Sequence, residues 1–155
     1  MQKVLPKYTL MIIPLASPLI LGVYEGNRLI KRVHSTEQTS QSLLPLVDKL
    51  IQEYPIEKII YTNGPGSYMA IKLSYIILKT VEITKGIPLY SCSAFETNNN
   101  QPIKAIGNLY FIKVKEDIIT KRFEVALKQS YWLPISLDTI KLEQDNTPDY
   151  RLPAV

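Results

Sequence analysis

The glycine-rich stretch Gly64, Pro65, Gly66 and Ser67 holds the residues best suited to binding chemistry, because a glycine-rich turn at the start of a helix can hold an anion. A P-loop would need the spacing Gly-x-x-x-x-Gly-Lys-Ser/Thr, and Lys72 lies too far into the expected helix to be its lysine. The glycines free the backbone, the proline stiffens it and the serine is a suitable helix cap. We therefore expect a structural turn, with phosphate binding as the alternative.

The other groups that commonly catalyse reactions are few. His34 is the only histidine and Cys92 the only cysteine. We interpret His34 as a surface residue at a strand end, and Cys92 as a buried strand residue because it ends the apolar run Pro88–Cys92. No Ser/His/Asp set and no converging group of metal ligands follows from the spacing. The sequence therefore predicts no catalytic, metal-binding or cofactor-binding residue, and no enzyme.

Composition places the chain among ordinary globular proteins. It has 155 residues, of which 46% are hydrophobic and 21% charged, enough for one compact domain or for one domain plus a stunted second lobe. The formal net charge of +4 comes from scattered basic residues rather than from a basic run, which favours surface solvation over direct RNA binding. A lone cysteine excludes an internal disulfide and fits a reducing cytoplasm.

The N-terminal region resembles a signal peptide only superficially. Lys3 and Lys7 precede an apolar stretch over residues 8–23. This stretch is short for a membrane span, and Pro14 and Pro18 would break a helix there. We expect two buried strands joined at the prolines, with no leader and no membrane segment.

The order of the expected elements indicates the fold. Strands are expected at 9–13, 19–25 and 28–33, a helix at 43–54, a strand at 57–62, a helix at 67–84 and a strand at 87–93. The short strand–helix–strand connections require a parallel pair with a right-handed crossover. The sequence thus predicts an α/β lobe of the RNase H-like/actin-like class over residues 1–97, with a mixed five-stranded sheet.

The rest of the chain is expected to form a small second lobe. Residues 98–102 read as a linker. A half-exposed strand is expected over 107–116, a turn at 117–119 and a returning strand over 120–128. Residues 104–155 are too few for a full second lobe, so we expect a truncated, β-rich one packed on the first.

The helix at 67–84 carries two apolar stripes. The wider one is expected to face the sheet and comprises Met69, Ala70, Leu73, Ile76, Ile77, Val81 and Ile83. The narrower one comprises Ile71, Tyr75 and Leu78, with Tyr68 beside it. Two stripes require a second burial partner, and we expect the narrower stripe to be a protein interface, together with Leu46 and Leu50 of the preceding helix. The alternative is that the second lobe covers it.

Four segments together resemble the TsaB family, also called YeaZ, over about residues 37–97 and the tail. They are a helix start with a proline, a Gly-Pro-Gly-Ser-aromatic turn leading into a helix, the strand after it, and a terminal Pro/Tyr/Arg motif: Gln41–Val47, Tyr61–Lys72, Lys85–Glu96 and Thr147–Leu152. Catalytic relatives of this fold need an acidic residue at the end of the first strand, where this chain has Pro14 and Leu15.

The resemblance implies a cytoplasmic, non-catalytic platform protein. Such a protein would hold the catalytic subunit TsaD in an active form and help to recruit the ATPase TsaE. That complex transfers a threonylcarbamoyl group to N6 of an adenosine in tRNA, and the platform would meet the tRNA only indirectly. Without TsaD, a homodimer through the same helices is expected. The alternatives are a nucleotide-binding or metallopeptidase-like enzyme of the same fold, and a structural homodimer unrelated to tRNA.

Overall fold

The structure, a computed structural model, describes residues 7–16, 18–35 and 39–151. Lys3 and Leu152, both named above, lie outside these ranges. Within them the chain forms two sheets, two α-helices and two short 3-10 helices, Ala94–Thr97 (η1) and Leu137–Thr139 (η2).

The larger sheet has five strands in the order β3-β2-β1-β4-β5. They are Tyr8–Ile13 (β1), Leu19–Glu25 (β2), Arg28–Ser35 (β3), Ile56–Thr62 (β4) and Leu89–Cys92 (β5). The first three pair antiparallel as a meander, whereas β4 pairs parallel with both β1 and β5. The predicted mixed five-stranded sheet of an RNase H-like/actin-like lobe is confirmed.

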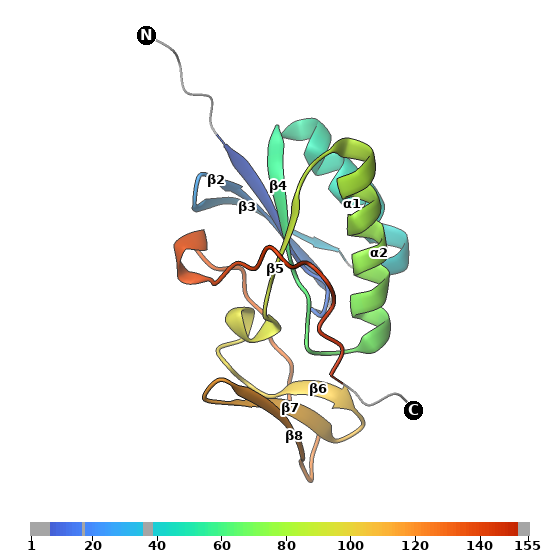
Figure 1. The fold of residues 1–155 in the computed structure, drawn as a ribbon, viewed down its shortest axis with the longest axis vertical. Coiled ribbons are helices and arrows are strands. Elements are labelled where there is room, and N and C mark those ends of the chain that lie inside the picture. The colour runs from blue at the N-terminus through green and yellow to red at the C-terminus, as the bar shows by residue number, and fades with distance from the viewer. Residues whose placement is uncertain (1–6, 17, 36–38, 152–155) are drawn as a thin grey trace.

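Two helices cover one face of this sheet, as Figure 1 shows. They are Thr39–Glu53 (α1) and Tyr68–Lys85 (α2). Both pack on the sheet face that carries Leu10 and Ile59, in one continuous apolar cluster. Gly86 ends α2 in the left-handed conformation, and its N–H donates to the carbonyl of Glu82. The expected stop of this helix at Gly86 is therefore confirmed.

The opposite face of the sheet is covered by the C-terminal part of the chain. Leu133, Leu137 and Ile140 pack there against Met11 and Tyr24. The Tyr24 hydroxyl donates to the carbonyl of Pro134 at 2.6 Å. The C-terminal part of the expected second lobe thus packs on the first lobe and completes its core.

The smaller sheet has three antiparallel strands in the order β6-β7-β8. They are Ile103–Ile106 (β6), Leu109–Val114 (β7) and Asp117–Arg122 (β8). Sequence reasoning missed β6. It also placed a turn at residues 117–119, which was wrong. The turn lies at residues 115–116, where Lys115 has a φ of 57°. The β-branched Ile118 and Ile119 belong to a strand, in register with Lys113 and Ile112.

The apolar N-terminal region forms strands, as expected. β1 and β2 run antiparallel through the centre of the larger sheet, and Pro14 is buried at the end of β1. Among the described residues, no helix is long and apolar enough to span a membrane.

Candidate interaction site and the closed glycine turn

The face that α2 turns toward the sheet is only partly the one expected from its sequence: Val81 and Ile77 pack in or against the core as expected, but Met69, Ile76 and Ile83 do not. Its buried residues are Ile71, Ser74, Leu78 and Val81. Ile71 and Leu78, predicted as exposed interface residues, are both 0% exposed. Their assignment to a partner interface was therefore wrong, because Leu78 packs in the core on the sheet and Ile71 is buried against the glycine turn.

Two local features explain this orientation. Ser74 lies in the middle of the buried stripe, but its hydroxyl donates to the carbonyl of Ala70 at 2.7 Å, so its burial leaves no unmet hydrogen bond. Ile71 lies directly against the glycine turn: a Cβ on Gly64 would stand 2.9 Å from the Cδ1 of Ile71. The turn thus fixes which side of the helix meets the sheet.

The apolar residues on the far side of α2 are exposed instead. Met69, Ile76 and Ile83, which we call the outer stripe, are 69%, 52% and 73% exposed. They are spaced seven residues apart, so they form a ridge along one side of the helix. Leu44 of α1 is also exposed. Three bulky apolar side chains in line on one helix are typical of a protein-binding surface.

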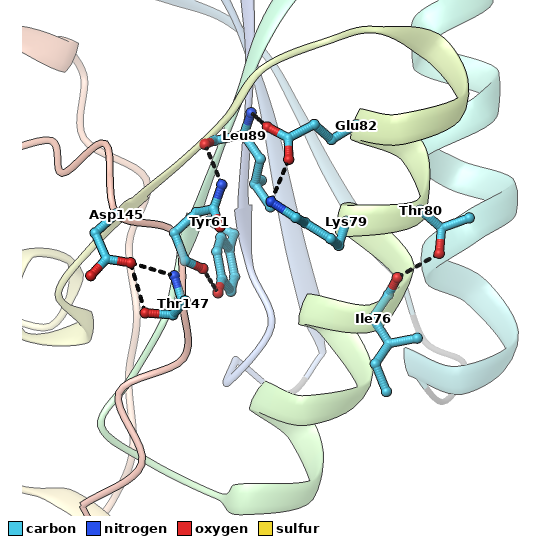
Figure 2. Close-up of polar contacts among 9 residues, drawn as sticks. Tyr61, Ile76, Lys79, Thr80, Glu82, Leu89, Asp145 and Thr147 are labelled. Atoms are coloured by element: carbon cyan, nitrogen blue, oxygen red, sulfur yellow. Dashed lines mark hydrogen bonds and ion pairs between the residues drawn. The ribbon is translucent and has the colours of Figure 1, made fainter.

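Threonines next to the outer stripe make it less polar than the sequence suggests. The hydroxyl of Thr80 donates to the carbonyl of Ile76 at 2.8 Å, and that of Thr84 donates to the carbonyl of Thr80 at the same distance. Figure 2 shows the first of these bonds on the side of α2 that faces away from the sheet. Because both hydroxyls donate within the helix, a partner that covers this face leaves neither hydroxyl donor unpaired.

The remaining predicted interface residues lie at different depths. Tyr68 is exposed, with its ring centroid 4.7 Å from that of Tyr150 in the C-terminal segment. Tyr75 is half-buried and stacks on Tyr61. On α1, Leu46 is half-buried and Leu50 is buried in the core. The C-terminal segment therefore contacts the Tyr68 side of α2, while the outer stripe stays uncovered by the described residues.

A hydrogen bond to the side chain of Glu82 joins the C-terminal half of α2 to the sheet. The carboxylate of Glu82 accepts from Nζ of Lys79 at 2.7 Å and from the N–H of Leu89 at 2.8 Å (Figure 2). The bond to Lys79, more than any other contact, lowers the pKa of Glu82 below its ordinary value. Glu82 thus joins the helix to the start of β5, and holds the angle at which the outer stripe is presented.

The glycine turn is a packed junction. Gly64, Pro65 and Gly66 are all buried. The N–H of Asp149 donates to the carbonyl of Asn63 at 2.8 Å, and a Cβ on Gly64 would stand 2.9 Å from the carbonyl oxygen of Asp149. The structural role expected of this turn fits that packing.

Of the other two residues of the turn, Gly66 is buried and Ser67 is exposed. A Cβ on Gly66 would stand 2.7 Å from the terminal methyl carbons of Leu15, so a larger residue there would require the Leu15 side chain to move. Ser67 precedes α2 as expected and is exposed, but its side chain makes no cap hydrogen bond. The serine therefore marks the helix start without capping it.

A polar cavity of about 370 Å³ lies where β4 and β5 end. Carboxylates and cations from three parts of the chain line it, among them Glu96, Glu116, Lys113, Asp145 and Asp149. Sequence reasoning found no acid at the strand ends because Asp145 and Asp149 come from the distant C-terminal segment. The only signal was the Thr-Pro-Asp-Tyr-Arg motif that contains Asp149.

The acids of this cavity are largely engaged with neighbours. Arg151 pairs with Asp149 at 2.8 Å. The carboxylate of Asp145 accepts from both the hydroxyl and the N–H of Thr147, which lowers its pKa (Figure 2). Within the described ranges, no three His, Cys, Asp or Glu residues are placed to share a metal ion.

Cys92 and His34 lie where the sequence placed them. Cys92 is buried in β5, and burial, with a smaller contribution from the charge of Glu96, raises the pKa of its thiol to about 12. A thiol with such a pKa is protonated at neutral pH and is a poor nucleophile. His34 is exposed near the end of β3.

The strand order and the helix placement define an RNase H-like/actin-like lobe with a small appended sheet. Among solved structures, the chain is similar to YeaZ from Pseudomonas aeruginosa, with a TM-score of 0.62, 15% identity, and coverage of 78% of this chain and 71% of that one. It is also similar to an uncharacterized protein described as resembling peptidase YeaZ from Pseudomonas aeruginosa, with a TM-score of 0.52, 13% identity, and coverage of 80% and 71%.

The resemblance to YeaZ inferred from the sequence is thus confirmed at the level of the fold. The sequence matches no family model, and no curated protein matches it either.

Proposed function

We propose that this chain is a non-catalytic partner protein in the modification that forms threonylcarbamoyladenosine in tRNA. It binds a TsaD-type catalytic subunit through the outer stripe of α2 and stabilises the active arrangement of that subunit. A TsaE-type ATPase joins the assembly, and tRNA is met only through these partners. The setting is cytoplasmic, and the chain forms a homodimer through the same helix when TsaD is absent.

The observation that carries the proposal is the exposed outer stripe on a helix that is otherwise firmly anchored. Met69, Ile76 and Ile83 line up on a helix whose opposite side is locked into the core by Ile71 and Leu78. A rigid helix with a ridge of bulky apolar residues loses little conformational entropy on binding, which favours a stable interface.

Two further features support a platform over an enzyme. At the end of β1, where metal-dependent relatives of this fold need an acidic residue, the chain has the buried Pro14 followed by Leu15. At the end of β4, the C-terminal segment packs onto the glycine turn, in a place where ligands bind in related α/β sheets. The chain would then act through conformational bias, since a partner that binds the active state of TsaD better than its inactive state raises the population of the active state.

The decisive experiment is co-purification with a TsaD-type protein from the same source. We expect the wild-type chain to hold TsaD, and Ile76→Arg to weaken the complex by about 30-fold or more, since truncation of central interface residues commonly costs about 2 kcal/mol or more. Ile135→Arg, the same change at another exposed isoleucine, serves as the matched control. Tyr75 is unsuitable for this test because its ring is half-buried against Tyr61.

Two results would contradict the proposal. Equal binding of TsaD by the wild type, Ile76→Arg and Ile135→Arg would remove the outer stripe from the interface. Turnover of Mg·ATP by the purified chain alone, abolished by Asp149→Asn, would favour the enzyme alternative and place the chemistry in the polar cavity.

A further inference from the structure

The small sheet ends in a free edge. In the order β6-β7-β8, β8 is the outermost strand, and no described residue pairs with its outer side. Five of its six residues are exposed. Such an edge offers unpaired backbone N–H and C=O groups to any strand that can approach it, and proteins commonly protect it with charged side chains, especially lysine.

The side chains along this edge carry both signs in a symmetric order. Asp117, Ile119 and Lys121 alternate along β8 and therefore share one face. Ile119 is 49% exposed and lies beside Ile112 of β7, and Val114, on the same face, is 47% exposed. Neither Asp117 nor Lys121 forms an ion pair with a described residue, although Nζ of Lys121 lies 5.3 Å from the ring of Phe123.

This order is complementary to itself. If a second copy of β8 approaches antiparallel, a twofold axis through Ile119 keeps the same face of both sheets on one side. Asp117 then lies opposite Lys121 of the second copy, and Lys121 lies opposite the second copy's Asp117. Between these two ion pairs, the exposed Ile119 side chains of the two copies meet.

We propose that two copies of this chain pair through their β8 strands, forming a continuous six-stranded antiparallel sheet across a twofold axis. The interface is isologous, as in most homodimers, and each copy gives the same edge. This pairing is separate from the outer stripe, because α2 lies beside the larger sheet whereas β8 lies at the bottom of the view, at the far end of the molecule (Figure 1). It therefore does not rest on the proposed function, and it is compatible with a partner bound at α2.

The side chains select one register. A shift that opposes Ile119 with Lys121 places Ile118 against Arg122 and separates both opposite-charge pairs. A shift that opposes Ile118 with itself places Asp117 against Ile119. Only the register centred on Ile119 forms two ion pairs and one apolar pair, and cross-strand pairs of these kinds stabilise sheets. The short edge buries little area, so the association is weaker than that of an obligate dimer.

Charge exchange tests this register directly by sedimentation equilibrium. The background carries Ile76→Arg, so that association through the outer stripe does not contribute. Asp117→Lys and Lys121→Asp each put like charges opposite each other twice, and each should raise the dimer dissociation constant by about tenfold or more. The double variant Asp117→Lys/Lys121→Asp restores the pairs with reversed sign and should return to within about threefold of the background.

The two single variants also test each other. Mixed in equal amounts, they should associate as a heterodimer, because one variant has lysine at both positions of the pair and the other has aspartate at both. Failure of both the double variant and the mixture to recover association would overturn the proposal. A dissociation constant that none of these changes alters would overturn it equally.

A disulfide provides an independent check on geometry. Directly opposed residues in antiparallel strands have Cα atoms about 4.5–5.5 Å apart, within the range of a disulfide. Under mild oxidation, Ile119→Cys should form a covalent dimer at least about tenfold faster than Val114→Cys, a control on the same face but on the inner strand β7. Native Cys92 is buried and does not compete. Equal rates for the two variants would exclude pairing through β8.

Discussion

The structure of α2 reverses the burial that its sequence pattern predicts for two isoleucines, and this reversal can be tested by mutation. Ile71 is 0% exposed and lies against the glycine turn, whereas Ile76, five residues on, is 52% exposed. Replacing each in turn by alanine removes the same atoms from the same helix. The two variants therefore differ only in the surroundings of the deleted side chain.

The expected magnitudes follow from those surroundings. Ile71→Ala removes three buried carbons and leaves a cavity next to Gly64, so it should lower the free energy of unfolding by about 3 kcal/mol, within the range of about 2–5 kcal/mol for such changes. For a chain of this size that corresponds to a drop in Tm of about 6–12 °C. Ile76→Ala exchanges a largely hydrated side chain for a better helix former and should change stability by less than about 0.5 kcal/mol.

Urea unfolding measures the difference. Circular dichroism reports on the helices, and the fluorescence of Trp132, the only tryptophan, reports on the C-terminal segment. Leu78→Ala serves as a second buried position and should resemble Ile71→Ala. If Ile76→Ala costs as much as Ile71→Ala, or if Ile71→Ala is silent, α2 is rotated about its axis relative to this structure and the outer stripe is not exposed.

Three further measurements test the packing of the glycine turn, the contacts of Glu82 and the burial of Cys92. Gly64→Ala should lower the free energy of unfolding by about 2 kcal/mol or more, because the φ of Gly64 is 119° and the new Cβ would stand 2.9 Å from the carbonyl oxygen of Asp149. The control Gly26→Ala, at a positive φ but with open space around it, should lower it by about 1 kcal/mol. Thermal unfolding measures both. Because the folded state lowers the pKa of Glu82, the ionised carboxylate contributes to the free energy of unfolding above its ordinary pKa of 4.5, and this contribution is lost as the pH falls through the folded-state pKa. Glu82→Gln should therefore lower Tm at pH 7 by an amount equivalent to at most about 1 kcal/mol. At pH 3 it should leave Tm unchanged. The Cys92 thiol should resist an aromatic disulfide reagent at pH 8 until urea unfolds the chain, since burial raises its pKa to about 12.

Local signals in the sequence were sufficient to predict the larger sheet and the order of the strands and helices that form and cover it. The Gly26-Asn27 hairpin, the helix stop at Gly86 and the parallel β4–β5 pair all lie where turn chemistry and the crossover rule put them. These features depend on a few neighbouring residues, so they can be read without knowing the tertiary contacts.

The candidate site was harder because it depends on distant contacts. The wheel of α2 shows two apolar stripes, and the wider one was chosen for the sheet because width normally marks burial. Ser74 breaks the apolar run of the stripe that is buried, so that stripe looked too narrow to face the core, although the Ser74 hydroxyl bonds to the carbonyl of Ala70 within the helix. Which stripe is buried is set by the contact of Ile71 with the glycine turn, and no local pattern encodes that contact.

The C-terminal segment was also beyond local reasoning. Its pairing with β5, through the N–H and the carbonyl of Ser91 with those of Glu143, joins residues far apart in the sequence. The sequence predicted part of the strands in the second lobe. It did not predict that residues 131–142 return to pack on the larger sheet, which only the three-dimensional structure shows.

That return has a consequence for how the protein is made. The ribosome synthesises Met11 and Tyr24 long before Leu133 and Leu137, which cover them. Until residues 133–140 have been made, the nascent chain therefore exposes an apolar sheet face, and a product that stalls or terminates before them leaves that face open to chaperones and proteases.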